Sequence, residues 1–117
     1  MGNFVDLKVW QLAKDLSIRV YQSTREGLIS KDLGLCRQMQ RSAVSIASNI
    51  AEGDESGSNR MAIKHFHVAK GSAAELMTQI IIAKEIGYLK EDFAEELISS
   101  CKSIGAILNR LIQIRKI

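Results

Sequence analysis

Residues 42–53 read SAVSIASNIAEG, a stretch with no charged residue before Glu52. Three serines and an asparagine lie among alanine, valine and isoleucine, and the loop-forming run DESGSN follows directly. A helix on the surface of a small protein normally carries charge on its solvent side. This helix is therefore expected to be buried on two sides, once inside its own bundle and once against a second copy of the chain.

The composition of the whole chain favours one helical domain spanning residues 1–117. A chain of 117 residues is long enough to bury roughly two-thirds of its unfolded surface without a disulfide or a metal. It contains no proline, the residue that most readily breaks a helix. The formal net charge is +3, a small basic surplus that permits nucleic-acid binding without requiring it.

Simple sequence patterns argue against a secreted, membrane-spanning or metal-binding protein. The start MGNFVDLK lacks the basic region and apolar run of a signal peptide, and no window of about 18 apolar residues is present. Cys36 and Cys101 lie far apart, without the spacing of a zinc site, and are expected to be small core residues. We therefore expect a cytoplasmic protein with no cofactor.

Glycine-containing clusters divide the chain into four segments with helical periodicity, at about 5–24, 32–52, 59–86 and 91–115. Spacings of four and three, typical of helices packed in a bundle, recur in the third and fourth segments. The expected core-facing residues are Val5, Val9, Leu12, Ala13, Leu16 and Val20; Leu35, Met39, Ala43, Ile46 and Ile50; Ala62, Phe66, Ala69, Ala73, Leu76, Ile80 and Ala83; and Leu97, Cys101, Ile104, Leu108 and Leu111. The sequence thus predicts an all-α, up-and-down antiparallel four-helix bundle.

Capping residues mark the ends of two of these helices. Ser30 is a plausible N-cap for the second helix and Ser58 for the third, because a serine hydroxyl accepts a hydrogen bond from a free N–H of the first turn. Gly53 and Gly87 are predicted to end the same two helices, since glycine adopts the left-handed conformation that often follows a last turn.

Each predicted helix also carries apolar residues away from its core-facing stripe. In helix order they are Leu7, Trp10, Ile18 and Tyr21; Val44, Ala47 and Ala51, together with Ser48; Ile63, Met77, Ile81 and Ile82; and Ile107, Ile112, Ile114 and Ile117. Large exposed apolar patches usually mark interaction sites. Some of these residues could instead widen the bundle's own core, Trp10 and Tyr21 most readily. For the second helix we expect burial between copies.

Small polar residues on the second and third helices are expected to form a hydrogen-bond network that fixes the helix register. The candidates are Arg41, Ser45, Asn49 and Glu52 on the second helix and Ser72 and Glu75 on the third. Two possible pairings are Asn49 with Ser72 and Glu75 with Arg41. Gly71 is expected to allow close approach of two backbones, because a mid-helix glycine costs about 1 kcal/mol relative to alanine.

A catalytic interpretation of the same region is weaker. Glu52 and Glu75 could act as paired carboxylates, and His65 and His67 as bases or ligands. The two histidines are two residues apart on a helix and so point in different directions. No ExxH pair, nucleophile elbow or phosphate-binding glycine loop is present in the sequence. We expect a protein that is not an enzyme.

The runs QMQRSAVSIASNIAEG and KHFHVAKGSAAELMTQIIIAKEIGYL, with the opening FVDLKVWQLAKDLSIRVYQST, resemble the bacterial four-helix-bundle proteins encoded in 23S ribosomal RNA intervening sequences. The resemblance covers about residues 4–116. It implies a left-handed bundle that assembles into a homopentameric ring. It also implies kinship with the accessory variability determinant of diversity-generating retroelements, a basic pentamer that binds nucleic acid and a reverse transcriptase. The matching structural residues are Arg41, Ser45, Asn49, Glu52, Gly53, Gly71, Ser72 and Glu75.

Two non-enzymatic functions follow as alternatives. The first is an oligomer that binds RNA or DNA, in which several copies multiply a modest charge. Its candidate contacts are Arg37, Arg41, Arg60, Lys64, Lys70, Arg110, Arg115 and Lys116, each of which could instead be an ordinary solvated charge. The second is a protein–protein scaffold ring with no nucleic-acid role, for which the apolar residues outside the core stripes provide the surface.

Overall fold

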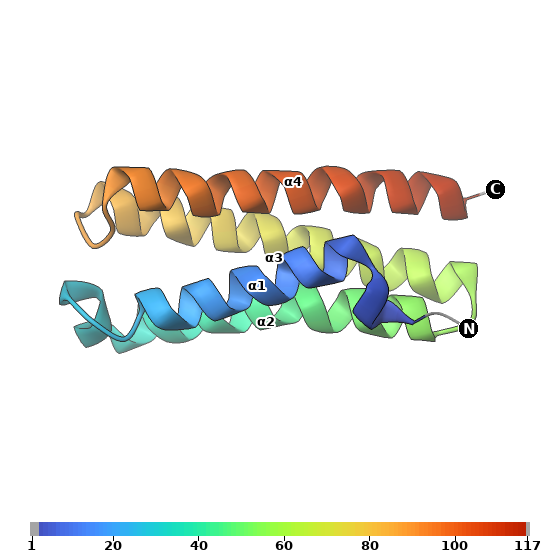
Figure 1. The fold of residues 1–117 in the computed structure, drawn as a ribbon, viewed down its shortest axis with the longest axis horizontal. Helices are drawn as coiled ribbons and strands as arrows, with labels where there is room; N and C mark the ends of the chain where they lie inside the picture. The colour runs from blue at the N-terminus through green and yellow to red at the C-terminus, as the bar shows by residue number, and fades with distance from the viewer. Residues whose placement is uncertain (1–2, 117) are drawn as a thin grey trace.

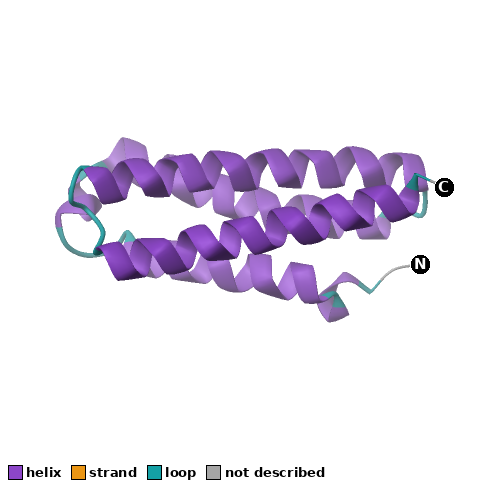
Figure 2. Cartoon of the chain, turned by 90° about the horizontal axis from the view of Figure 1, so that it is seen from above, coloured by secondary structure: helices purple, strands orange, loops and turns teal. Residues whose placement is uncertain are grey.

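Residues 3–116 are described by a computed structural model, which consists of four long α-helices side by side in an elongated bundle (Figures 1 and 2). The helices are α1 (Lys8–Ser23), α2 (Leu33–Glu55), α3 (Asn59–Glu85) and α4 (Glu91–Arg115), with short 3₁₀ turns η1 (Phe4–Asp6) and η2 (Leu28–Lys31). The bundle measures 46 × 21 × 19 Å. Consecutive helices run in opposite directions, and residues 3–116 contain no strand. The predicted up-and-down helical bundle is confirmed.

Local signals set the ends of α3 and α4 as predicted. Ser58 caps α3, with its hydroxyl oxygen accepting a hydrogen bond from the Met61 N–H at 3.3 Å. Gly87, with a φ of 86°, makes the turn after α3. Helix α4 begins at Glu91 and ends at Arg115, the bounds expected from the sequence.

The predicted N-cap of α2, Ser30, was wrong, because the chain makes an additional 3₁₀ turn before the helix, although α2 begins at Leu33, close to the expected start at about 32. Ser30 lies within that turn, and its hydroxyl donates to the Gly27 carbonyl at 2.7 Å. The N-cap is Asp32, whose Oδ1 accepts a hydrogen bond from the Leu35 N–H at 3.1 Å. The other oxygen of Asp32 accepts from the Tyr88 hydroxyl at 3.1 Å, which ties the start of α2 to the α3–α4 connection.

The predicted end of α2 at Gly53 was also wrong, because the helix continues through this glycine to Glu55. Gly53 is buried, and a Cβ at this position would lie 2.7 Å from Cε1 of Phe66 on α3. Gly57, with a φ of 72°, follows the helix instead. Gly53 therefore serves close packing between α2 and the Phe66 ring rather than helix termination.

Replacing Gly53 with alanine is expected to lower the free energy of unfolding by about 1–3 kcal/mol, because the new methyl group must displace a fully buried ring. Urea unfolding monitored by circular dichroism would measure the change. Gly105→Ala is the matched control, since a Cβ there meets nothing within 4 Å and alanine is the better helix former. Equal stability of Gly53→Ala and the wild type would contradict the packing role.

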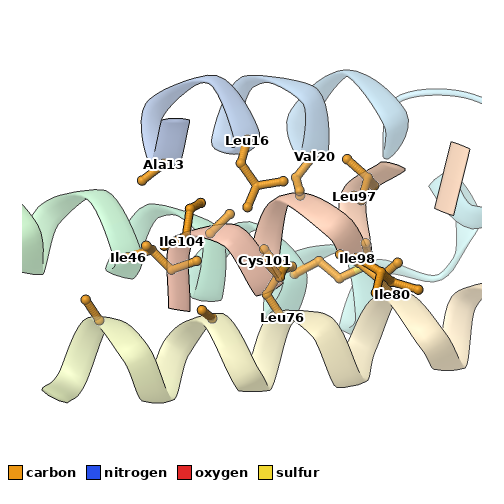
Figure 3. Close-up of a cluster of buried hydrophobic side chains, with 14 of the residues drawn as sticks. Ala13, Leu16, Val20, Ile46, Leu76, Ile80, Leu97, Ile98, Cys101 and Ile104 are labelled. Carbon is orange, nitrogen blue, oxygen red and sulfur yellow. The ribbon is translucent and has the colours of Figure 1, made fainter. Parts of the chain in front are cut away.

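All four long helices contribute to one core. Leu16 of α1, Ile46 of α2, Leu76 of α3 and Ile104 of α4 lie in this core and are almost fully excluded from solvent (Figure 3). The predicted stripe of α3 is confirmed at all its positions, Ala62, Phe66, Ala69, Ala73, Leu76, Ile80 and Ala83. The regular spacing of these residues in the sequence thus predicted correctly which side of α3 is buried.

The expected core stripe differs from the structure at both ends of the chain, and its members Leu12 and Leu35 are only partly buried. Val5 is exposed, because it belongs to η1 and not to α1. In the last turns of α4, Ile112 is buried while Leu111 is only partly buried. A helix of 3.6 residues per turn drifts from a strict seven-residue repeat, which moves the buried side from position 111 to position 112.

Both cysteines are buried, as expected for core residues, and no disulfide joins them. Burial raises the pKa of Cys101 to about 12, which keeps its thiol protonated at neutral pH. The Cys36 thiol donates to the Ile29 carbonyl at 3.0 Å, and its pKa is raised by burial and by the Asp32 carboxylate.

No helix within residues 3–116 is long and apolar enough to cross a membrane.

Candidate functional site

A chain of hydrogen bonds joins α2 to α3 along their shared flank. The Asn49 amide nitrogen donates to the Ser45 carbonyl at 2.9 Å and to the Ser45 hydroxyl at 3.2 Å. The Ser45 and Ser72 hydroxyls lie 2.9 Å apart, and His65 Nδ1 lies 3.1 Å from the Asn49 amide oxygen. Because an amide oxygen only accepts hydrogen bonds, His65 Nδ1 is the donor in this contact.

The pairings in this network differ from the two considered from sequence. The Ser42 hydroxyl donates to Glu75 Oε1 at 3.1 Å, so serine rather than Arg41 is the partner of Glu75. Asn49 reaches Ser72 only through Ser45. Arg41 and Glu52 are exposed and lie outside the network.

His65 belongs to the network, and sequence reasoning missed this because it treated the histidine only as a base or ligand. Its position seven residues before Ser72 was the available signal, since seven residues bring a side chain back to the same flank of a helix. His67 is exposed, so the two histidines do point in different directions as predicted.

The Asn49→Ala variant is expected to lose about 1–3 kcal/mol of stability, because it removes the amide that links Ser45 to His65. A double-mutant cycle with His65→Ala would measure the coupling between the two side chains. Asn109→Ala is the control, since Asn109 is an exposed asparagine in a surface contact with Lys70. Unchanged melting of Asn49→Ala would show that the network adds no stability.

An apolar groove lies between α1 and α2 and encloses about 450 Å³. It is lined by Lys14, Ser17, Ile18, Tyr21, Gln22, Arg25, Val44, Ala47 and Ser48. Ile18, Tyr21 and Val44 are exposed there by 47, 39 and 42%. Some of the apolar residues outside the core stripes of the first two helices, namely Ile18, Tyr21, Val44 and Ala47, therefore meet on one surface, which we call the α1–α2 groove.

The remaining residues outside the core stripes divide into several groups. Leu7, Trp10, Ile63, Met77 and Ile107 pack against the core, and Ile112 belongs to it. Ile81, Ile82 and Ile114 are exposed. Ala51 is half-buried, and Ile117 lies outside the described residues. Trp10 therefore extends the core of its own bundle, whereas Tyr21 lines the α1–α2 groove.

Lysine and arginine residues gather where the first half of α3 lies beside the second half of α4. Residues 59–74 and 97–116 contain Arg60, Lys64, Lys70, Lys102, Arg110, Arg115 and Lys116 and no aspartate or glutamate. The antiparallel packing of the two helices brings the segments together, as the hydrogen bond from Lys70 Nζ to Asn109 Oδ1 at 3.0 Å shows. We call this surface the basic face.

The basic face contains six of the eight sequence-predicted nucleic-acid contacts. Arg37 and Arg41 are separated from it, because they lie in the first half of α2, toward the other end of the bundle. Lys102 was missed by the sequence prediction. Its position seven residues before Asn109 places it on the side of α4 that faces Lys70, and it lines a shallow groove with both.

Arg115 differs from the other cations of the basic face because it is held against the bundle. Its guanidinium carbon lies 5.5 Å from the centre of the Phe66 ring, and Nη2 lies 3.6 Å from Asp54 Oδ1. The Asp54 side chain is only 7% exposed. Arg115 therefore offsets a buried carboxylate and is less available to a ligand than Arg60, Lys64, Lys102, Arg110 and Lys116, all of which are exposed.

Charges at the opposite end of α4 are arranged differently. This end carries Glu91, Asp92, Glu95 and Glu96. Lys84 Nζ lies 2.9 Å from Glu95 and Arg19 Nη2 lies 2.7 Å from Glu96. The hydrogen bond to Glu95 raises the pKa of Lys84. Lys84 and Arg19 at the acidic end are thus paired with carboxylates, whereas the basic face concentrates positive charge.

Residues 3–116 bring together no group of three or more histidine, cysteine, aspartate or glutamate side chains suited to holding a metal ion. Of the carboxylates considered for paired catalysis, Glu75 accepts a hydrogen bond from Ser42, and Glu52 is exposed on α2.

A family model described as "23S rRNA-intervening sequence protein" matches residues 5–110. A crystal structure of a protein with unknown function from the S23 ribosomal protein family of Bacteroides thetaiotaomicron aligns with this chain at a TM-score of 0.83 and 20% sequence identity. The alignment covers 90% of this chain and 95% of that chain, which shows a shared fold. A comparison with curated proteins gave no match.

Proposed function

The chain belongs to the 23S rRNA-intervening sequence protein family, and we propose that it is a self-associating, non-enzymatic bundle that binds nucleic acid through its basic face. The observation that carries the proposal is the concentration of seven lysine and arginine residues, with no acidic residue, on residues 59–74 and 97–116. The small net charge of +3 conceals this local excess, because the acidic residues lie elsewhere in the chain.

The chemistry of the basic face suits a phosphate backbone. Lysine and arginine release counterions when they neutralise phosphates, and this release supplies most of the sequence-independent affinity for nucleic acid. The exposed side chains of the face include no tryptophan, tyrosine or phenylalanine on which bases could stack. Backbone contact, rather than base stacking, is therefore the expected mode.

Self-association supports the same proposal by multiplying the contacts. Two apolar helix faces meet in the α1–α2 groove, where a second copy would bury them. An assembly that places several basic faces on one polyanion binds more tightly than one copy, because each later contact is intramolecular. The resemblance noted from sequence puts the number of copies at five.

The direct test is the binding of fluorescent RNA and DNA oligonucleotides at increasing salt, with protein mass measured in parallel by light scattering. We expect binding at low salt that weakens steeply as salt rises, with a linear relation between the logarithms of affinity and salt concentration. Absence of binding at low salt would refute the nucleic-acid role.

A protein-binding scaffold is the second candidate, and the α1–α2 groove is the observation that favours it. A groove with an apolar floor and a few polar groups at its edges also suits a helix of a different protein. Affinity capture that recovers one defined protein in stoichiometric amount, unaffected by nuclease, would support this candidate over the first.

A further inference from the structure

A second apolar surface, distinct from the α1–α2 groove, runs along α3. Met61, Val68, Ile82 and Ile86 are exposed by 41–55%. Met61 and Val68 are seven residues apart, and Ile82 lies fourteen residues after Val68, so these three side chains share one flank of the helix. Glu75 occupies the intervening position of the same repeat. We call this surface the α3 stripe.

The α3 stripe borders the contact between α3 and α2. Ser72 and Glu75, which hydrogen-bond to Ser45 and Ser42 of α2, lie on the same flank of α3 as Val68. The α1–α2 groove lies on the other side of α2. The groove and the stripe therefore occupy adjacent sides of the bundle.

We propose that the α3 stripe of one copy docks into the α1–α2 groove of the next copy. This inference rests on the proposed self-association and identifies the two surfaces that meet. Two different apolar surfaces on one chain fit a head-to-tail contact, in which each copy offers one surface and receives the other. Contact between adjacent sides turns each copy relative to the previous one, which gives a ring if the rotation closes and a helical filament if it does not.

The charges of the two surfaces are complementary. Lys14 and Arg25 are the only positively charged residues that line the groove, and no aspartate or glutamate lines it. Lys14 already lies 2.9 Å from Asp15, whereas Arg25 is exposed. The stripe presents Glu75, exposed and with one carboxylate oxygen engaged by Ser42. Lys64, which belongs to the basic face, adjoins the Met61 end of the stripe, whereas Glu75 lies at its centre and is the charge that suits Arg25 at the groove edge.

Gly71 gives a second, independent indication. It lies in the middle of α3 between Val68 and Glu75, is exposed, and would place a Cβ in open space. Within residues 3–116 of one copy, no other backbone approaches Gly71 closely, so the approach predicted for this glycine is absent there. Since glycine here costs the helix about 1 kcal/mol relative to alanine, close approach by the helices of a neighbouring copy provides the reason for it.

The test uses two matched variants, Val44→Glu in the groove and Val68→Glu in the stripe. Both valines are exposed to a similar extent, so each variant is expected to fold. Each alone is expected to remain monomeric, and an equimolar mixture is expected to form a one-to-one complex, because one partner keeps an intact stripe and the other an intact groove. Ile114→Glu, at an exposed position outside both surfaces, is the control and should assemble normally.

Three results bear on the outcome. Normal assembly of Val68→Glu, or a mixture in which both folded variants stay monomeric, would overturn the proposed docking while leaving self-association intact. A monomeric wild type at high concentration would instead refute the proposed self-association itself. The Gly71→Ala substitution tests whether Gly71 acts at the contact between copies. In the monomeric Val44→Glu variant it should raise the melting temperature, because alanine is the better helix former. In the otherwise wild-type chain it should weaken assembly.

Discussion

Replacing Ala47 with glutamate is expected to convert the assembly into monomers. Ala47 is half-buried in the floor of the α1–α2 groove, between Val44 and Ser48. A carboxylate there would have to lose its water when a second copy covers the groove, at a cost of about 3–5 kcal/mol if it stays unpaired. Because each 1.4 kcal/mol changes affinity tenfold, association should weaken by at least about a hundredfold. Sedimentation equilibrium over a range of concentrations would measure the change.

The fold of Ala47→Glu should survive, since the groove is open to solvent in a single copy. Circular dichroism and melting would verify this. Ala47→Ser is the conservative control and should assemble like the wild type, because a small hydroxyl residue already lines the groove at Ser48. An intact assembly of Ala47→Glu would place the groove outside the interface between copies.

Reversing two charges on the basic face, in the double variant Lys102→Glu/Arg110→Glu, is expected to weaken nucleic-acid binding at least about tenfold at low salt. Both side chains are exposed on α4, and neither lines the α1–α2 groove. Each lost phosphate contact should also lower the slope of log affinity against log salt by about one. Fluorescence anisotropy with one labelled RNA across a salt series would give both quantities.

The control reverses the same number of charges elsewhere, in Lys31→Glu/Lys90→Glu. These exposed lysines lie at the opposite end of the bundle, in η2 and immediately before α4. The two double variants have equal net charge, so a difference between them reports the position of the charges and not their sum. Equal loss of binding in both would contradict a localised basic face and favour non-specific attraction.

Local sequence signals predicted those features that depend on one helix at a time. The spacing from Ala62 to Ala83 reported the buried side of α3, and Ser58 identified its first turn. The same signals failed where one residue type serves two purposes. Gly53 follows an apolar run as a terminating glycine would, yet its small size allows contact with the Phe66 ring. Only the position of α3 distinguishes the two roles.

The sequence predicted which residues belong to the candidate surfaces, but it did not predict how these residues are arranged in space. The sequence identified Ile18, Tyr21, Val44 and Ala47 as apolar residues outside the core stripes, and the structure joins them in one groove. It also identified eight candidate cations, of which the antiparallel contact of α3 with α4 gathers six and leaves Arg37 and Arg41 apart. Pairings such as Asp54 with Arg115 join residues distant in sequence, so no local pattern reports them.

The sequence by itself determined the four helices, most of the buried side of each and the presence of some apolar residues that one core does not cover, because periodicity and capping act within a turn or two of chain. Tertiary structure decided which flanks adjoin. The axial register of α2 against α3 sets Ser42 opposite Glu75 and Ser45 opposite Ser72, and the antiparallel pairing of α3 with α4 sets one basic segment beside another. These arrangements depend on packing between helices, where each side chain's partner is fixed by the fit of the whole bundle.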